Sequence, residues 1–171
     1  IFAKSGEEED GTTEIDLEHK AISAFMAKAY VDFIKKTNNN PKIAIGIDAR
    51  PTGPAIADSM IRVLLANGIK PMYLGITAAP EIMAFSKKLD GFIYISASHN
   101  PIGHNGIKFG TNDGGVLNAQ ENSKLIAKFN EILKDDDLVQ KLVTKAFFFF
   151  LFTYSQSLLI LFCLICFNLC S

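Results

Sequence analysis

The sequence lacks the excess of positive charge that nucleic-acid-binding proteins carry. Its 171 residues include 17 lysines and arginines against 18 aspartates and glutamates, so the formal net charge is −1, and the basic residues form no cluster. Binding to a polyanionic backbone depends on such a cluster. We therefore expect no nucleic-acid partner.

Cysteine is confined to the end of the chain, at Cys163, Cys166 and Cys170. The rest of the chain therefore has no disulfide framework. Cys163 and Cys166 have C-x-x-C spacing, but leucine, isoleucine and phenylalanine surround them and no other ligand is nearby in the sequence. We interpret them as part of an apolar segment and not as a metal or redox site.

The first residues also lack the pattern of a leader sequence. The chain begins with Ile1 and not with methionine, and its start has no basic stretch followed by an apolar one. We expect no signal peptide, a cytoplasmic protein and a missing start. Residues 1–15 are polar and include the acidic run at residues 7–10, which predicts a solvated N-terminal arm.

Charged side chains are absent from residues 146–171, whereas residues 1–145 have the mixture of an ordinary globular protein. We consider two explanations for this apolar tail, which we place at residues 141–171. One is a transmembrane helix over residues 146–170, with Lys141 and Lys145 on the cytoplasmic side. The other is translated intron or frameshifted sequence, since the residue types of the tail use T-rich codons. The polar patch inside the tail favours the second explanation, because such a patch is costly in a bilayer.

Apolar runs alternate with amphipathic segments between residues 16 and 140, which we interpret as one domain. This alternation predicts an α/β fold with a mostly parallel, mixed sheet and helices on both of its faces, joined by right-handed crossovers. After the third strand, a turn-rich link predicts a hairpin. We expect helices at residues 16–36, 52–67 (with Thr52 as the cap), 80–88 and 119–133, and strands at 42–47, 69–75 and 91–95.

Polar residues follow two of the expected strands at the point where each strand ends. Asp48 and Arg50 come directly after the first strand, and residues 96–105 come after the third. Ligands of parallel sheets bind at the carboxyl ends of the strands. Asp48 and Arg50 therefore have two possible roles: an ion pair at a strand end, or part of an active site.

Residues 96–108 (SASHNPIGHNGIK) are small and polar, and they contain one serine that is well placed for chemistry. A serine hydroxyl is a poor nucleophile unless other groups position or activate it. Phosphoryl transfer relaxes this requirement, because its catalysis consists mainly of positioning and charge neutralisation. Pro101 restricts the backbone, and the turn at residues 105–106 can bring Lys108 back toward Ser98. These residues make Ser98 suited to carry a phosphoryl group, but taken alone they favour an ordinary turn.

Residues 96–101 (SASHNP) followed by residues 105–108 (NGIK) closely resemble the phosphoserine loop of the α-D-phosphohexomutases, the phosphoglucomutase and phosphomannomutase superfamily. Residues 46–54 (GIDARPTGP) resemble the G-x-D-x-R-x-S-G-P segment of that family, and residues 91–95 resemble its strand before the serine loop. The resemblance covers residues 16–140, which correspond to the first of the four domains in this family.

The resemblance implies roles for five residues. Ser98 would carry the phosphoryl group, and one oxygen of its phosphate would bind Mg²⁺. Lys108 would act in proton transfer or stabilise the transferring charge. His99, Asn100 and Arg50 would belong to the loop that contacts phosphate or substrate. The implied reaction moves a phosphoryl group between the C1 and C6 oxygens of a hexose phosphate, with a hexose 1,6-bisphosphate as intermediate and activator.

The sequence departs from the family pattern in ways that predict an N-terminal fragment without turnover of its own. Residues 1–15 contain no arginine, although the family carries a catalytic arginine near its start. The family's aspartate-rich metal loop, sugar-recognition loop and phosphate-binding loop are all absent, so we expect the other Mg²⁺ ligands to come from a missing domain. The three aspartates at residues 135–137 are interpreted as a linker. The alternative hypothesis is a non-catalytic, tail-anchored membrane protein that reuses the fold for binding.

Overall fold

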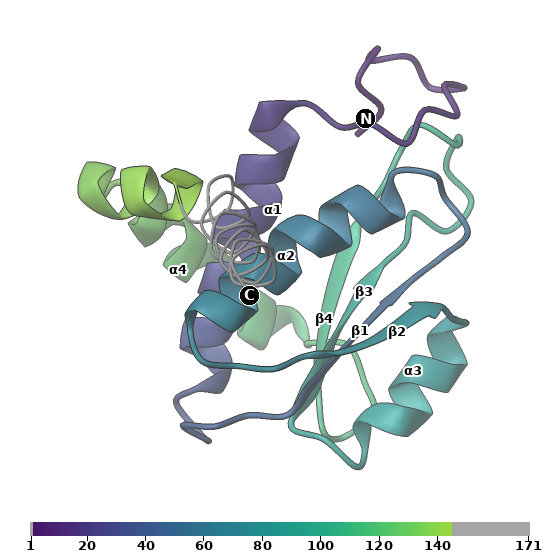
Figure 1. Cartoon of the computed structure of the whole chain (residues 1–171). Coiled ribbons are helices and arrows are strands. Elements are labelled where there is room, and N and C mark those ends of the chain that lie inside the picture. Colours follow the sequence, from purple (N-terminus) through teal and green to yellow (C-terminus); the bar gives the residue numbers. More distant parts are fainter. Residues whose placement is uncertain (1, 145–171) are drawn as a thin grey trace, which may run out of the picture.

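The computed structural model describes residues 2–144 and shows a four-stranded sheet with helices on both faces (Figure 1). The strands are β1 (Ile43–Ile47), β2 (Met72–Ile76), β3 (Gly91–Ile95) and β4 (Ile107–Thr111), and their order in the sheet is β2-β1-β3-β4. β1 is parallel to both of its neighbours, whereas β4 is antiparallel to β3. The predicted α/β class with a mostly parallel, mixed sheet is therefore confirmed.

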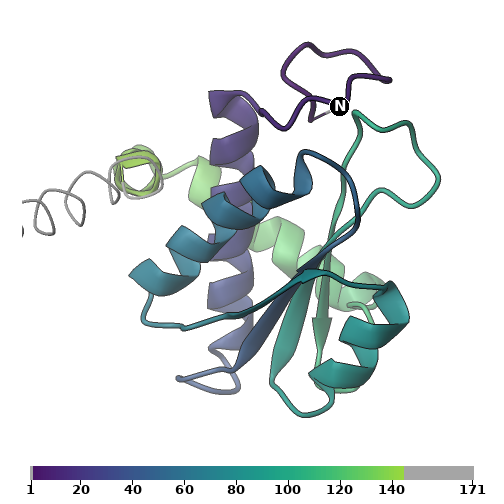
Figure 2. The same cartoon turned by 45° about the vertical axis from the view of Figure 1, so that its right-hand side comes forward.

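The helices divide unequally between the two faces of the sheet. α1 (Leu17–Ile34), α2 (Gly53–Ala66) and α4 (Ala119–Leu133) pack together on one face, and α3 (Ala79–Ser86) covers the other (Figures 1 and 2). A further helical segment runs from residue 136 to residue 144, the last described residue. The chain thus forms three layers, as expected when crossover helices bury both faces of a parallel sheet.

The two central strands are buried along their whole length. Ile43, Ile45 and Ile47 face the core under α1 and α2, whereas Ala44 belongs to the smaller core under α3. A Cβ added at Gly46 would lie 2.9 Å from Ile82 of α3, so the strand and that helix approach closely at this glycine. Burial on both faces explains why the sequence of β1 is a continuous apolar run and does not alternate with polar residues.

Two local expectations differ from the structure. β2 begins at Met72, three positions later than predicted, because Pro71 has no N–H for the ladder. No second strand is assigned between β4 and α4; an isolated antiparallel bridge joins Gly110 to Val116, so the expected hairpin is reduced to this bridge. α4 then begins at a capping box formed by Asn118 and Glu121.

The N-terminal segment, predicted to be a solvated arm, is docked on the domain. The backbone N–H groups of Phe2 and Ala3 donate to the carbonyl of Gly103 at 2.8 and 3.0 Å, and the N–H of Gly103 donates to the carbonyl of Glu8 at 2.7 Å. Ala3 is buried, while Glu8 remains exposed. Gly103 permits this contact because a Cβ there would lie 2.9 Å from the Glu8 carbonyl oxygen. The segment is docked and not free in solvent because its backbone pairs with that of Gly103. The composition of the segment does not reveal this pairing.

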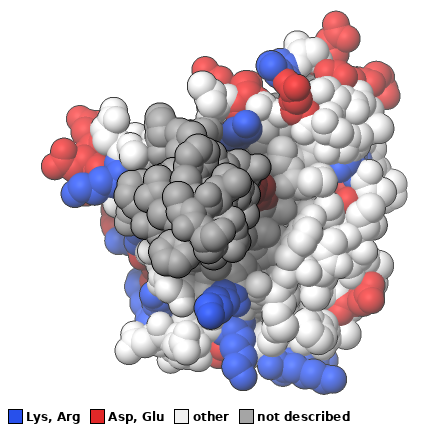
Figure 3. Space-filling view, viewed as in Figure 1, with Lys and Arg blue, Asp and Glu red and all other residues white. Residues whose placement is uncertain are grey.

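The surface shown in Figure 3 carries acidic side chains mainly at its top and lysines mainly along its bottom edge. The acidic run at residues 7–10 belongs to the docked N-terminal segment, so it lies beside the loop that contains Gly103. Among residues 2–144, no helix has the length and apolar character needed to cross a bilayer. The two explanations for residues 146–170 concern residues outside those described.

Candidate active site

The two loops predicted to contain functional residues meet at the carboxyl ends of β1 and β3. These strands are adjacent and parallel, so both chains leave the sheet at the same edge. The N–H of Asp48 donates to the carbonyl of Ile95 at 2.9 Å, which extends the ladder past the end of the strand. The N–H of Ala97 donates to Asp48 Oδ2 at 3.3 Å. The structure therefore brings the Asp48 and Ser98 loops into direct contact.

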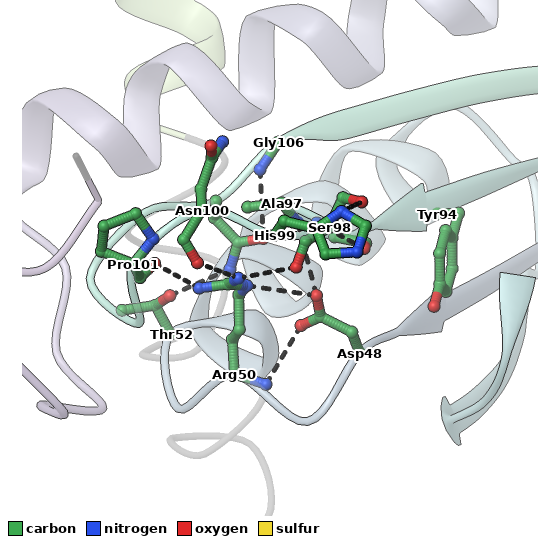
Figure 4. A network of polar contacts seen from close by, with 12 residues as sticks. Asp48, Arg50, Thr52, Tyr94, Ala97, Ser98, His99, Asn100, Pro101 and Gly106 are labelled. Carbon is green, nitrogen blue, oxygen red and sulfur yellow. Dashed lines mark hydrogen bonds and ion pairs between the residues drawn. The ribbon is translucent and has the colours of Figure 1, made fainter. Parts of the chain in front are cut away.

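Arg50 lies between the two loops (Figure 4). Its guanidinium is against the backbone of residues 96–106, which we call the serine loop. It donates to the carbonyl oxygens of Ser98 at 3.1 Å, of Asn100 at 2.5 Å and of Pro101. Its Nε lies 3.3 Å from Asp48 Oδ2, close enough for an ion pair, although the geometry is not that of a hydrogen bond. Asp48 and Arg50 thus lie close together, and Arg50 also contacts the serine loop.

Ser98 has an unusual backbone conformation for a residue that is not glycine. Its φ is +56°, and among residues 2–144 no other non-glycine residue has a positive φ. This left-handed region is strained for an L-residue, by about 1–3 kcal/mol, and such strain persists only where the surroundings enforce it. The Ser98 side chain is exposed, and its Oγ lies 3.1 Å from His99 Nδ1. A hydroxyl next to an imidazole nitrogen can give up its proton to it.

The return of the serine loop to β4 is fixed by two further polar contacts. The N–H of Ser96 donates to the carbonyl of Gly106 at 2.9 Å. Asn105 Nδ2 donates to Thr52 Oγ1 at 3.0 Å, and Thr52 is fully buried. The prediction that Thr52 caps α2 is wrong for its side chain, which makes no cap hydrogen bond. Sequence reasoning missed this contact because Thr52 and Asn105 are far apart in the chain.

Lys108 lies on β4 directly opposite Tyr94 of β3. Its Nζ is 5.7 Å from the centroid of the Tyr94 ring, a cation–π distance, and its side chain is exposed. Burial raises the pKa of Tyr94, whose hydroxyl donates to the carbonyl of Thr77 at 3.0 Å. Lys108 is thus on the strand that leaves the serine loop, with its ammonium above Tyr94. His99 and Asn100 are exposed beside Ser98.

The residues from 2 to 144 do not by themselves form a divalent metal site. No group of three or more histidine, cysteine, aspartate or glutamate side chains in this part of the chain is placed to hold an ion. Asp48, a carboxylate beside the serine loop, already contacts Arg50 and the Ala97 N–H. A hard cation such as Mg²⁺ requires about six oxygen ligands. Residues 2–144 alone therefore do not supply a complete set of Mg²⁺ ligands.

Comparison with known proteins gives a consistent result. Residues 10–136 match the family model described as "Phosphoglucomutase/phosphomannomutase, alpha/beta/alpha domain I". The chain is 35% identical over 96 residues to a phosphoglucosamine mutase of Bacillus cereus (strain B4264) and 36% identical over 96 residues to that of Bacillus cytotoxicus. Each alignment covers 55% of this chain and 21% of the relative.

A solved structure also resembles this one. The crystal structure of a putative phosphomannomutase from Thermus thermophilus superposes with a TM-score of 0.61 at 25% sequence identity. The superposition covers 64% of this chain and 26% of that chain. The chain thus spans about a fifth of the length of the phosphoglucosamine mutases and about a quarter of the solved structure.

Proposed function

Because this chain belongs to the phosphoglucomutase/phosphomannomutase family, through a match to its domain I, we propose that it carries the phosphoserine of a hexose-phosphate mutase, with the phosphoryl group on Ser98. The observation that supports this most is the conformation of Ser98. It is exposed at the carboxyl edge of the sheet, yet its backbone is held at a φ of +56°. Such strain is typical of functional positions.

In the proposed reaction, a sugar hydroxyl attacks the phosphorus of phosphorylated Ser98. The bond between phosphorus and Ser98 Oγ breaks as the bond to the sugar oxygen forms, and a hexose bisphosphate results. After the sugar turns round, Ser98 Oγ attacks the other phosphoryl group and takes it back. The proton of the sugar hydroxyl ends on Ser98 Oγ, and we propose that His99 Nδ1, 3.1 Å from that oxygen, accepts it when Oγ attacks. Lys108 would stabilise negative charge on the transferring group.

The substrate class is a hexose phosphate. The similar proteins are described as phosphoglucosamine mutases and a putative phosphomannomutase, and a sugar phosphate is common to these names. We propose a hexose 1,6-bisphosphate as the activator that first phosphorylates Ser98. When bound to the Ser98 phosphate, Mg²⁺ would neutralise charge, with its other ligands supplied from outside residues 2–144.

A domain replacement tests the proposed function. Residues 10–136 are substituted for the matching region of the Bacillus cereus phosphoglucosamine mutase, whose own N-terminal residues before that region are kept. We expect this chimera to convert its sugar phosphate at a rate within about 100-fold of the parent enzyme, the loss that a misplacement of 1 Å can cause. A control carries only residues 96–108. A chimera that is folded but shows no conversion, while the control is active, would contradict the proposal.

A further inference from the structure

The side chain of Arg50 contacts the backbone of the serine loop at several points. Three of the five N–H groups of the Arg50 guanidinium donate to carbonyl oxygens of the loop, those of Ser98, Asn100 and Pro101 (Figure 4). These carbonyls lie within four consecutive residues that begin at Ser98. A planar, rigid fork of five donors is suited to bind several carbonyls at fixed positions.

Asp48 fixes Arg50 in turn. Its Oδ1 accepts the backbone N–H of Arg50 at 3.0 Å, and its Oδ2 lies 3.3 Å from Arg50 Nε. Oδ2 also accepts the N–H of Ala97, the residue before Ser98, at 3.3 Å. The Asp48 and Arg50 side chains are mostly buried, with 21% and 12% exposed, so solvent screens their interaction only partly. The pair therefore contacts the serine loop on both sides of Ser98.

The contact with the Ser98 carbonyl also orients the next peptide unit. In a trans peptide the carbonyl and the N–H point in opposite directions, and the described residues contain no cis peptide bond. Because the Ser98 carbonyl faces the guanidinium, the N–H of His99 points away from it. Backbone N–H groups that face outward from a turn favour an anion such as a phosphate.

We propose that Arg50, held by Asp48, is a positioning residue that keeps Ser98 in its left-handed conformation, and that it does not bind the phosphate of the substrate. This inference rests on the proposed function of Ser98 but uses different atoms. Its two terminal nitrogens donate to the three loop carbonyls and its Nε lies 3.3 Å from Asp48 Oδ2, so the guanidinium is directed into the protein. A lysine at this position keeps the charge but lacks the fork, and it should not replace arginine.

The first test measures hydrogen exchange in the full chain. We expect Arg50→Lys and Arg50→Met to speed the exchange of amides in residues 96–106 by at least about tenfold, while amides of α1 and α4 change little. Arg62→Met is the matched control, since Arg62 binds Asp58 on the surface of α2 at 2.8 and 3.1 Å and should leave the loop unchanged. Wild-type exchange in the loop of Arg50→Lys would overturn the proposal, because charge alone would then be sufficient.

The second test measures phosphoryl uptake at Ser98 of the chimera from glucose 1,6-bisphosphate in the presence of Mg²⁺. We expect Arg50→Lys to lower the maximal rate by about 100-fold without changing the half-saturating bisphosphate concentration, because the substitution displaces Ser98 and Arg50 does not touch the sugar phosphate. Guanidinium added to Arg50→Ala should restore part of the rate, and sodium chloride at equal ionic strength should not. An increase in the half-saturating concentration alone would overturn the proposal. No uptake by the chimera with Arg50 intact would count against the proposed function, and the exchange experiment would still decide the role of Arg50.

Discussion

Replacing Ser98 by alanine is expected to lower the turnover of the chimera by at least about 1,000-fold, since loss of a covalent nucleophile costs on the order of 10⁶-fold in a well-studied enzyme. The reason is chemical and not structural. The Ser98 side chain is exposed, and its hydroxyl contacts only the neighbouring His99 ring. Removing that hydroxyl leaves no buried polar group without a hydrogen-bond partner. The free energy of unfolding should therefore change by less than about 1 kcal/mol. Steady-state kinetics and urea unfolding measure the two effects separately.

The matched control for this prediction is Ser123→Ala. Ser123 is also exposed, and its Oγ donates to the carbonyl of Ala119 within α4 at 2.9 Å. This variant should turn over at the wild-type rate. If the Ser98→Ala chimera kept more than about a tenth of the turnover, Ser98 would not be the covalent carrier.

The second large effect concerns the stability of the fold. Gly91→Ala is expected to lower the free energy of unfolding by at least about 3 kcal/mol. A Cβ at Gly91 would overlap the Tyr30 hydroxyl and would lie 2.7 Å from both the Gly110 carbonyl oxygen and Ile34 Cδ1. All of these groups are buried where α1 crosses the start of β3, so none can move into solvent. Urea unfolding of the full chain measures the loss, and Gly11→Ala is the control, since a Cβ there meets nothing within 4 Å.

A double-mutant cycle with Tyr30→Phe identifies the cause of that loss. The buried Tyr30 hydroxyl donates to the Gly110 carbonyl at 2.7 Å, so Tyr30→Phe alone should cost about 1–2 kcal/mol. In the Tyr30→Phe background, one of the overlapping atoms is gone. We therefore expect Gly91→Ala to cost less there, by at least about 0.5 kcal/mol. Strict additivity of the two substitutions would show that the overlap with Tyr30 is not the cause.

The secondary structure was largely predictable because the signals are local. The continuous apolar run of β1 reflects burial on both faces, and the Asn67-Gly68 pair marks the end of α2. The serine loop could also be identified from the sequence as a candidate site, because small polar residues directly follow an apolar strand. The docking of residues 2–10 could not be predicted, since it depends on backbone groups that any sequence possesses.

The internal support of the serine loop was only partly predictable. The sequence placed Asp48 and Arg50 at a strand end beside Ser98, and it left open an ion pair or an active-site role. The structure shows the ion pair together with contacts to the serine loop. Which carbonyls Arg50 reaches depends on residues 48 to 51 positions away in the sequence, and no local pattern encodes that. The contact between Thr52 and Asn105 was not predictable for the same reason, since these residues are 53 positions apart in the sequence.

The position of the Lys108 side chain could not be predicted from its spacing to Ser98 in the sequence. A turn at residues 105–106 was expected to bring Lys108 toward Ser98, and the chain does turn back there into β4. Strand register then decides where the side chain lies: Lys108 pairs with Tyr94, four positions before Ser98, and its ammonium is above that ring. Its role at the transferring phosphoryl group stays a prediction.

The position of the phosphoryl group is the most direct test of the proposal that Ser98 is the covalent carrier. The full chain and the chimera are incubated with glucose 1,6-bisphosphate and Mg²⁺, digested and analysed by mass spectrometry. For the chimera we expect one phosphoryl group in the peptide that contains residues 96–101, assigned to Ser98 and absent from the Ser98→Ala variant. A chimera that converts its sugar phosphate while the phosphoryl group lies on another residue, or while it carries none, would contradict that proposal.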